Sequence, residues 1–300
     1  MSAAPAIAAK APVKQEGHAL PVAVICLAIL AVWYLAAIPM NMVVVGPKIE
    51  AAGGGFSNML AYAWNDQRPV IPAPHQIALE LWKSVFTVKP WMPKSLVYHG
   101  WVTLASTLLG FVLGSLLGIV LAVAIVHVPF LSKSLMPWII ASQTVPILAI
   151  APMVIVVLGS LGFTGLLPKS LISMYLCFFP VTIGMVKGLT SPDTMQLDLM
   201  RTYNAGTAQV LGKLRFPASV PFLFTSLKVA VAIALTGAIV GELPTGAVAG
   251  IGARLLSGSY YGQTVQIWAA LFMGAFIAAG LVWLVGVAER FTLKRMGARP

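Results

Sequence analysis

DLMRTYNAGTAQVLGKLRFPASVP, residues 198–221, is a polar, charged and helix-prone stretch between two segments that are almost wholly apolar. The chain has 300 residues, of which 59% are hydrophobic and 9% are charged, and its mean hydropathy is +0.92. This balance lies outside the range of soluble domains and is typical of an integral membrane protein. The stretch at 198–221 is therefore predicted to be a compact segment in water between two membrane spans.

Uncharged runs predict six membrane-spanning helices. A helix needs about 20 apolar residues to cross roughly 30 Å of hydrocarbon. Two shorter runs, 170–186 and 229–241, become spans if the flanking lysines extend to the interface. Four runs are long enough by themselves: 17–47, 95–132, 134–168 and 255–288. The predicted fold class is an all-α integral membrane protein with six transmembrane helices.

Glycines and prolines mark the central spans. Gly110, Gly114 and Gly118 are spaced four apart in the second span, and small residues at that spacing predict close packing against another helix. The third span, at about 135–159, contains three prolines and is expected to be kinked.

The formal charge of +11 is explained by membrane topology rather than by a nucleic-acid partner. If the N-terminus is cytoplasmic, six spans place 12 of the 19 lysines and arginines inside. Five of the other seven fall in one long outer loop, where the positive-inside rule acts weakly. We therefore expect a multi-pass protein of the bacterial inner membrane, with both termini in the cytoplasm, the lipid bilayer as its surroundings and no nucleic-acid partner.

The polar segment at 190–217 is predicted to form two short helices joined by a corner. Ser191 is expected to cap the first helix, because a serine hydroxyl can accept a hydrogen bond from an N–H of the first turn. Tyr203, Asn204 and Ala205 are expected to make the corner, since asparagine tolerates a left-handed backbone.

The second short helix is predicted to begin at Gly206, with Gln209 three residues later as half of a capping box. Pro217 is expected to end it. The predicted product is a rigid elbow on the cytoplasmic side of the membrane.

This elbow resembles the EAA loop of permease subunits in binding-protein-dependent ABC importers. The family pattern is E-A-A, three residues, G, nine residues and I-x-L-P. Asp198 for Glu keeps the charge and Asn204 for Gly keeps the corner, whereas Leu-Met replaces Ala-Ala. The resemblance implies that the segment couples the chain to a separate ATPase dimer through Asp198, Leu199, Met200, Tyr203, Asn204, Ala205, Gly206, Leu214 and Pro217.

The resemblance extends from about Val70 to Arg295. VIPAPHQIALELW (70–82), SQTVPILAIAPMVIVVLG (142–159) and the run that begins FPASVP (216–221) are similar to the branch that includes nitrate, sulfonate, taurine and pyrimidine-precursor permeases. It implies the type I ABC importer permease fold. It also implies two further partners: a second permease copy, expected to give a homodimer, and a periplasmic solute-binding protein.

The predicted domains follow from these boundaries. They are a disordered cytoplasmic N-terminus (1–18), a first span with an extracytoplasmic loop (19–69), a permease transmembrane domain (70–295) that contains the coupling segment (190–217), and a C-terminal tail (296–300).

The chain is not expected to hydrolyse ATP. The nearest match to a phosphate-binding loop, Gly206 to Lys213, has its glycines six apart, and Leu214 stands where serine or threonine is needed for magnesium. Cys26 and Cys177 lie in apolar runs without metal-ligand spacing. We therefore predict a transport subunit rather than an enzyme, with no catalytic residue, no metal and no cofactor, and with ATP hydrolysis in another chain.

Five residues are candidates for the substrate pathway. Glu242, at the outer end of the fifth span, either bonds to backbone amides of the following Gly-rich loop or has a substrate or gate role. Gln143, Thr144 and Tyr175, on the kinked central spans, either line the pathway or make interhelical hydrogen bonds. Arg254 either attracts an anionic solute or is a solvated loop residue.

Two other function classes stay open at this point. An ion-driven secondary transporter or channel is disfavoured because those mechanisms usually place charged relays in mid-span. A structural or receptor-like protein is disfavoured by the proline-kinked spans and the Gly-rich outer loop. The solute also stays open among a small oxyanion, a sulfonate, taurine and a neutral heteroaromatic such as a pyrimidine.

Overall fold

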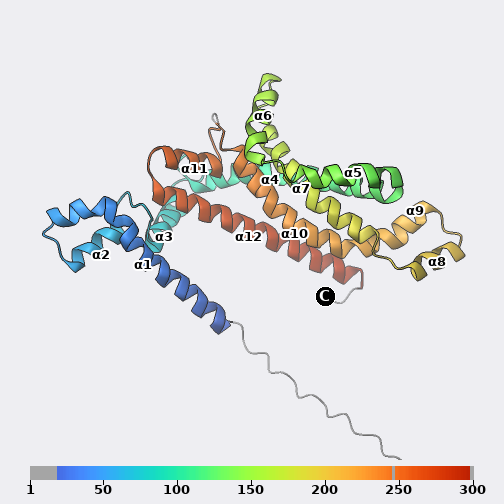
Figure 1. Cartoon of the computed structure of the whole chain (residues 1–300), viewed down its shortest axis with the longest axis horizontal. Coiled ribbons are helices and arrows are strands. Elements are labelled where there is room, and N and C mark those ends of the chain that lie inside the picture. Colours follow the sequence, from blue (N-terminus) through green and yellow to red (C-terminus); the bar gives the residue numbers. More distant parts are fainter. Residues whose placement is uncertain (1–18, 245–246, 298–300) are drawn as a thin grey trace, which may run out of the picture. The chain divides into compact units, whose positions relative to one another are not determined.

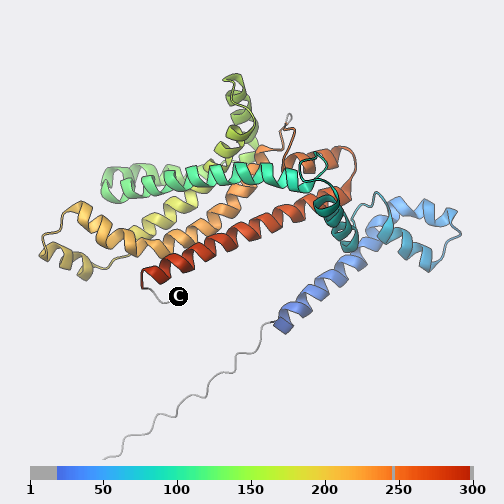
Figure 2. The same cartoon turned by 180° about the vertical axis from the view of Figure 1, so that it is seen from behind.

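The computed structural model describes residues 19–244 and 247–297, and these residues form helices and loops without strands (Figures 1 and 2). The predicted disordered N-terminus, 1–18, and the last residues of the predicted tail lie outside the described residues. The chain divides into two compact units, Met1–Pro74 and His75–Pro300. Each unit is described by itself.

The first unit is a helical hairpin, and the chain that follows the hairpin folds back onto it. α1 (Ala19–Ala51) has 33 residues and is therefore roughly 50 Å long, which exceeds the thickness of a membrane core. α2 (Phe56–Asn65) packs beside it. The amide of the fully buried Asn41 donates to the carbonyls of Ala63 at 2.8 Å and Ile71 at 2.9 Å. These bonds hold the chain after α2 against α1.

The second unit is a bundle of long helices with short helices at its two ends. α8 and α9 lie at one end and α11 at the other, and α12 ends on the side of α8 (Figures 1 and 2). In chain order the elements are α3 (Pro74–Trp82), the π-helical turn η1 (Lys83–Thr87), α4 (Leu96–His127), α5 (Pro129–Ser142), α6 (Ile147–Ser160), α7 (Leu166–Leu189), α8 (Thr194–Thr202), α9 (Thr207–Val210), the π-helical turn η2 (Leu211–Arg215), α10 (Phe216–Gly241), α11 (Ile251–Tyr260) and α12 (Thr264–Arg295).

The six predicted spans correspond to five helices and one bent pair. Within the described residues, α1, α4, α7, the run from α9 to α10, and α12 are each long and apolar enough to cross a membrane. α5 and α6 meet that test only together, and they are bent by 98° at a short break. The break precedes Pro146, whose ring disfavours a helical conformation in the residue before it. In place of the single kinked helix predicted for the third span, the structure has a bent helix pair, the geometry of a broken span or a re-entrant loop.

α7 lies at the centre of the second unit, packed between α4 and α10. A β-carbon added to Gly114 of α4 would lie 2.8 Å from the carbonyl oxygen of Met174 on α7. On the other side, one added to Gly237 of α10 would lie 2.8 Å from the Cα of Ser173. No side chain fits at such separations, so these helices touch through their backbones. The close packing predicted for the second span is confirmed.

Replacing Gly114 with valine should destabilise the bundle, because the added side chain overlaps the α7 backbone. Overpacking of this kind costs about 2 kcal/mol of unfolding free energy. Gly280→Val on α12 is the matched control, since no atom lies within 4 Å of a β-carbon there. Tryptophan fluorescence of the purified protein during heating should show a lower melting temperature for Gly114→Val only. Equal melting temperatures for the two variants would show that the α4–α7 contact is not a backbone contact.

Candidate functional site

The elbow segment, residues 190–217, begins with a capped helix. The carboxylate of Asp193 accepts the N–H of Gln196 at 2.8 Å, and the side chain of Gln196 accepts the N–H of Asp193 at 3.3 Å. The prediction that Ser191 caps this helix is wrong. Its hydroxyl donates to the Gly188 carbonyl at 2.7 Å, so Ser191 belongs to the end of α7. A carboxylate is favoured over a hydroxyl at this position because its charge complements the helix dipole.

The corner of the elbow has the predicted backbone. Asn204 has φ of 50°, the only positive φ of a non-glycine residue in the described part of the chain. Its N–H donates to the Arg201 carbonyl at 2.8 Å, and the N–H of Ala205 donates to the Met200 carbonyl at 3.0 Å. The left-handed corner predicted at Asn204 is therefore confirmed, and it turns the chain between α8 and α9.

The second part of the elbow departs from the prediction. The N–H of Gly206 donates to the side chain of Gln209 at 3.1 Å, so the predicted half capping box is confirmed. Pro217, however, does not end the helix, because α9, η2 and α10 form one run from Thr207 to Gly241. Pro217 has no N–H to donate, and the wider π-helical turn η2 lies directly before α10, where it accommodates that loss. The part of the elbow that follows the corner and the fifth span therefore form one continuous helix, Thr207–Gly241, which we call the rod.

Apolar side chains are exposed on the elbow. Leu199 is 58% and Tyr203 77% exposed, and Met195 is also exposed, whereas Met200, Ala205, Leu214 and Pro217 are partly buried. Asp198 pairs with Arg201 at 3.0 Å, but both side chains are largely solvated. A solvated pair of this kind contributes little stability, so Asp198 can change partners at small cost. The surface suits contact with another protein.

Two interactions fix the rod near the elbow. The Arg215 guanidinium donates to the carbonyl of Leu189 at 3.0 Å and so ties the start of α10 to the end of α7. Further along, the Lys228 ammonium forms an ion pair with the Glu289 carboxylate of α12. Lys228, which flanks the apolar run 229–241, thus also makes a helix-to-helix contact.

The other end of the rod holds a buried carboxylate. Glu242 follows α10 directly and is fully buried. Its Oε2 lies 2.9 Å from the Thr103 hydroxyl of α4 and accepts the N–H of Gly252, in the first turn of α11, at 2.9 Å. The Lys169 ammonium of α7 lies 3.6 Å from its Oε1. Four helices therefore meet at one carboxylate.

A histidine completes this group. His99 Nδ1 accepts the N–H of Gly250 at 3.1 Å, which leaves Nε2 to carry the proton that it donates to the Pro93 carbonyl at 2.8 Å. Gly250 has φ of +128°, and a β-carbon there would overlap the Glu242 carboxylate. We call this group the Glu242 cluster, and its members are His99, Thr103, Lys169, Glu242 and the segment 250–252.

Sequence reasoning missed most of the Glu242 cluster. It singled out Glu242 and expected bonds to backbone amides as one of two alternatives, and the Gly252 N–H makes such a bond. Lys169 was counted only as a charge beside a span, and His99 and Thr103 lie within apolar runs. The spacing of Gly250 and Gly252 after Glu242 was the one available signal, since glycines mark places where backbone approaches a neighbour closely.

The remaining pathway candidates lie elsewhere. Gln143 and Thr144 occupy the break between α5 and α6, where both are exposed. Tyr175 donates its hydroxyl proton to the Ser142 carbonyl at 2.7 Å, so it joins α7 to that break. Arg254 is partly buried on α11, and its Nε has no hydrogen-bond partner within the described residues. Whether any of the four lines a pathway stays a prediction.

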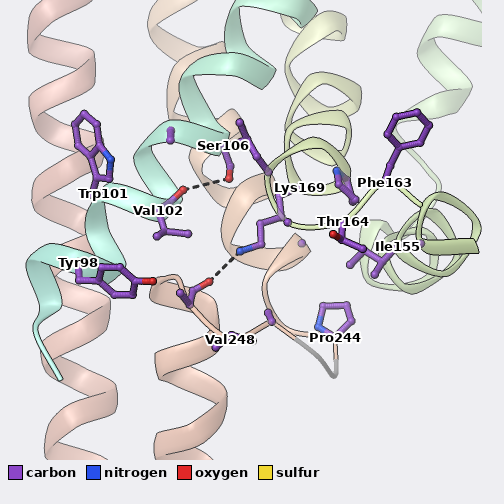
Figure 3. A pocket seen from close by; sticks show the side chains of 18 residues that line it. Tyr98, Trp101, Val102, Ser106, Ile155, Phe163, Thr164, Lys169, Pro244 and Val248 are labelled. Atoms are coloured by element: carbon purple, nitrogen blue, oxygen red, sulfur yellow. Dashed lines mark hydrogen bonds between the residues drawn. The ribbon is translucent and has the colours of Figure 1, made fainter. Parts of the chain in front are cut away.

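A cavity of about 750 Å³ lies beside the Glu242 cluster (Figure 3). It is bounded by α4, α6, the start of α7 and the chain that follows α10. Lys169 points into this space and donates to the Ala249 carbonyl at 2.9 Å (Figure 3). We call it the Lys169 cavity. Its other notable lining residues are the aromatic Tyr98, Trp101 and Phe163 and the hydroxyl-bearing Ser106 and Thr164.

The comparison with protein families covers the elbow and, within the Glu242 cluster, Lys169, Glu242 and the segment 250–252. Residues 114–297 match the family described as "Binding-protein-dependent transport system inner membrane component". A probable ABC transporter permease protein of Haemophilus influenzae is 30% identical over 204 residues, which are 68% of this chain and 78% of that protein.

Two relatives are named for their solutes. A riboflavin transport system permease protein of Chloroflexus aurantiacus is 29% identical over 225 residues, which are 75% of this chain and 80% of that protein. A formylaminopyrimidine transport permease protein of Halalkalibacterium halodurans is 30% identical over 188 residues, which are 62% of this chain and 73% of that protein.

Glu242→Ala should strongly destabilise the bundle, because it leaves the buried Lys169 ammonium without its counter-ion and the Gly252 N–H without its acceptor. Removing one partner of a buried ion pair costs about 3 to 5 kcal/mol of unfolding free energy. Glu242→Gln keeps an acceptor for Gly252 and should cost about 1 to 2 kcal/mol. Thermal unfolding of the purified proteins should give the lowest melting temperature for Glu242→Ala, an intermediate one for Glu242→Gln and the highest for the native protein. Equal melting temperatures for the Glu242→Ala variant and the native protein would show that the Glu242 cluster does not stabilise the bundle.

Proposed function

Because the chain belongs to the family of binding-protein-dependent transport system inner membrane components, we propose that it forms the membrane pathway of an ATP-driven importer. Family membership agrees with the predicted resemblance and with the type I ABC permease fold, and the formylaminopyrimidine relative falls within the predicted branch. The proposed importer carries a small solute that a periplasmic binding protein delivers. The relatives are permease components, so this chain is a transport subunit.

The proposed partner at the elbow is an ATPase dimer. The exposed Leu199 and Tyr203 supply apolar contact area, and Asp198 can exchange its solvated partner for a cation on the ATPase. The left-handed corner at Asn204 fixes the angle between α8 and the rod. A rigid element with an apolar surface suits mechanical coupling better than catalysis.

The proposed topology has both termini in the cytoplasm of a bacterial cell and the chain in its inner membrane. The end of α12 lies on the same side of the second unit as the elbow (Figures 1 and 2). If the elbow meets a cytoplasmic ATPase, the C-terminal end is cytoplasmic as well. The Glu242 cluster and the Lys169 cavity, at the opposite end of α10, then face the periplasm.

The continuous helix from the elbow into the fifth span is the observation that carries the proposed mechanism. The run from Thr207 to Gly241 has 35 residues, so it spans roughly 50 Å. In a homodimer of permeases, closure of two ATPases moves two elbows toward each other. Each rod then carries that displacement to its Glu242 cluster as a rigid-body switch.

An ion-driven transporter is the second candidate function, and the ion pairs argue against it. Lys169–Glu242 and Lys228–Glu289 each join neighbouring helices within the described residues. Neither belongs to a row of titratable groups of the kind that relays protons across a membrane. Uptake into vesicles that contain the reconstituted transporter decides between the two functions: it should require ATP hydrolysis and persist when ionophores collapse the ion gradients. Uptake without ATP that follows an ion gradient would contradict the importer.

Tyr203→Ser should weaken binding of the ATPase, because it removes a large exposed anchor from the docking surface. Loss of an aromatic anchor typically costs about 1 to 2 kcal/mol, so affinity should fall about tenfold. Tyr260→Ser on α11 is the matched control, since Tyr260 is 73% exposed against 77% for Tyr203 but lies at the other end of the bundle. Affinity of immobilised permease for the purified ATPase gives the comparison. Equal affinities would exclude Tyr203 from the interface.

Asn204→Val should uncouple the transporter, because a β-branched residue is strained by about 1 to 3 kcal/mol at positive φ. Membrane insertion and expression should stay normal, while ATP-dependent uptake should fall by about tenfold or more. Asn204→Gly is the control that keeps the left-handed corner and should retain most of the uptake. An Asn204→Val variant that binds the ATPase and supports full uptake would show that the elbow is not the lever.

A further inference from the structure

Three successive backbone N–H groups at the start of α11 are held by side chains from other elements. The first N–H groups of a helix have no partner within that helix. In α11 the donor and acceptor pairs are Gly250 N–H with His99 Nδ1 at 3.1 Å, Ile251 N–H with the Thr103 hydroxyl at 2.8 Å, and Gly252 N–H with the Glu242 carboxylate at 2.9 Å. We call these three bonds the α11 latch, because they attach the first turn of α11 to α4 and to the end of α10.

His99 takes part in the α11 latch only as a neutral imidazole. Its Nε2 donates a proton to the Pro93 carbonyl at 2.8 Å, so Nδ1 keeps the lone pair that accepts the N–H of Gly250. A protonated ring has a hydrogen on both nitrogens, and two donors would then face each other. His99 is also only 5% exposed, so the added charge would be poorly solvated. Protonation of His99 and closure of the latch therefore exclude each other.

Titratable groups surround His99 on the elements packed against it. They are the Tyr98 ring of α4, the Lys169 ammonium of α7, the Glu242 carboxylate after α10 and the Arg254 guanidinium of α11, while α12 presents the uncharged Met273 and Ile277 beside Gly100. The two cations repel a further positive charge on the imidazole. Glu242 changes its charge in acid as well, so an experiment has to separate its titration from that of His99.

We propose that protonation of His99 opens the α11 latch, so that the first turn of α11 separates from α4 in mildly acidic surroundings. A solvated imidazole binds a proton at about pH 6.5. The open state can hold this proton and the closed state cannot. Each unit of pH below that value therefore favours the open state by about tenfold.

The α11 latch adjoins one wall of the Lys169 cavity. Residues 247–249 line this cavity and come directly before Gly250, and the Ala249 carbonyl accepts a hydrogen bond from Lys169 at 2.9 Å (Figure 3). Val248 is 94% exposed, so its side chain does not anchor the segment. Opening of the latch frees this wall to move and changes access to the cavity. That the sensed pH is the periplasmic one rests on the topology proposed above.

Hydrogen exchange of the latch amides tests the proposal. The full chain is placed in lipid nanodiscs, and mass spectrometry follows exchange at residues 250–252 at about pH 7.5 and about pH 5.5. Each rate is divided by the chemical rate of an unprotected amide at the same pH. Protection should fall about tenfold between the two conditions. The buried stretch 230–238 of α10 is the internal reference and should keep its protection.

Two results in the native chain would overturn the proposal. One is equal protection of residues 250–252 at the two pH values. The other is an equal loss of protection in the reference stretch of α10, since that would report a general loosening of the bundle in acid.

Variants separate His99 from Glu242. In His99→Asn an amide oxygen takes the place of Nδ1 as acceptor but does not titrate, so protection should change less than about twofold. Glu242→Gln retains His99 and removes the other titratable acceptor, so the change of about tenfold should persist. A full pH response in His99→Asn, or its loss in Glu242→Gln, would contradict the proposal. The native chain and its internal reference remain a test even if a variant does not fold.

The exchange assay contains no ATPase, ATP or binding protein. A failure of ATP-dependent uptake therefore leaves the exchange result intact and counts against the proposed function alone. Protection that does not depend on pH, together with normal uptake, counts against the His99 switch and leaves the importer in place.

Discussion

The unbroken helical run from Thr207 to Gly241 is the feature on which the account depends, because it joins the elbow to the Glu242 cluster. The run is held at three points along its length. Arg215 bonds to the end of α7, Lys228 pairs with Glu289 of α12, and Glu242 gathers α4, α7 and α11 around its carboxylate. A displacement at the elbow therefore has a direct mechanical route to the other end of the bundle.

Backbone contact between helices explains how such a displacement can pass along the bundle without being lost to side-chain rearrangement. Gly114 and Gly237 bring α4 and α10 against the backbone of α7, and the fully buried residues of the neighbouring core are small or of medium size: Cys177, Val181, Ala230 and Ala234. Interfaces of this kind contain few long side chains that could change rotamer, so the helices respond as bodies. The Lys169 ammonium lies where this packed unit meets the Lys169 cavity, beside the junction at Glu242.

Much of the fold was predictable from the sequence, because its signals are local. Uncharged runs give the spans, the four-residue spacing of glycines gives the α4–α7 contact, and the conformational tolerance of asparagine gives the corner at Asn204. The predictions were wrong at positions where two local conformations of the chain are close in free energy. Asp193 replaced Ser191 as the cap because a carboxylate complements the helix dipole better, and a π-helical turn let the helix continue through Pro217. The Lys169–Glu242 pair was not predictable, since helices far apart in the chain bring the two residues together.

Paired distance measurements in the assembled transporter test the central claim most directly. One spin label per permease copy is attached at Gln196→Cys on the exposed face of α8 or at Ser259→Cys on α11, in chains with Cys26→Ser and Cys177→Ala, and the distance between copies is measured with and without ATP. The account predicts that ATP changes both distances, and that Asn204→Val suppresses the change at Ser259→Cys. An ATP-dependent change at Gln196→Cys with a constant distance at Ser259→Cys would show that the rod does not carry motion from the elbow to the Glu242 cluster.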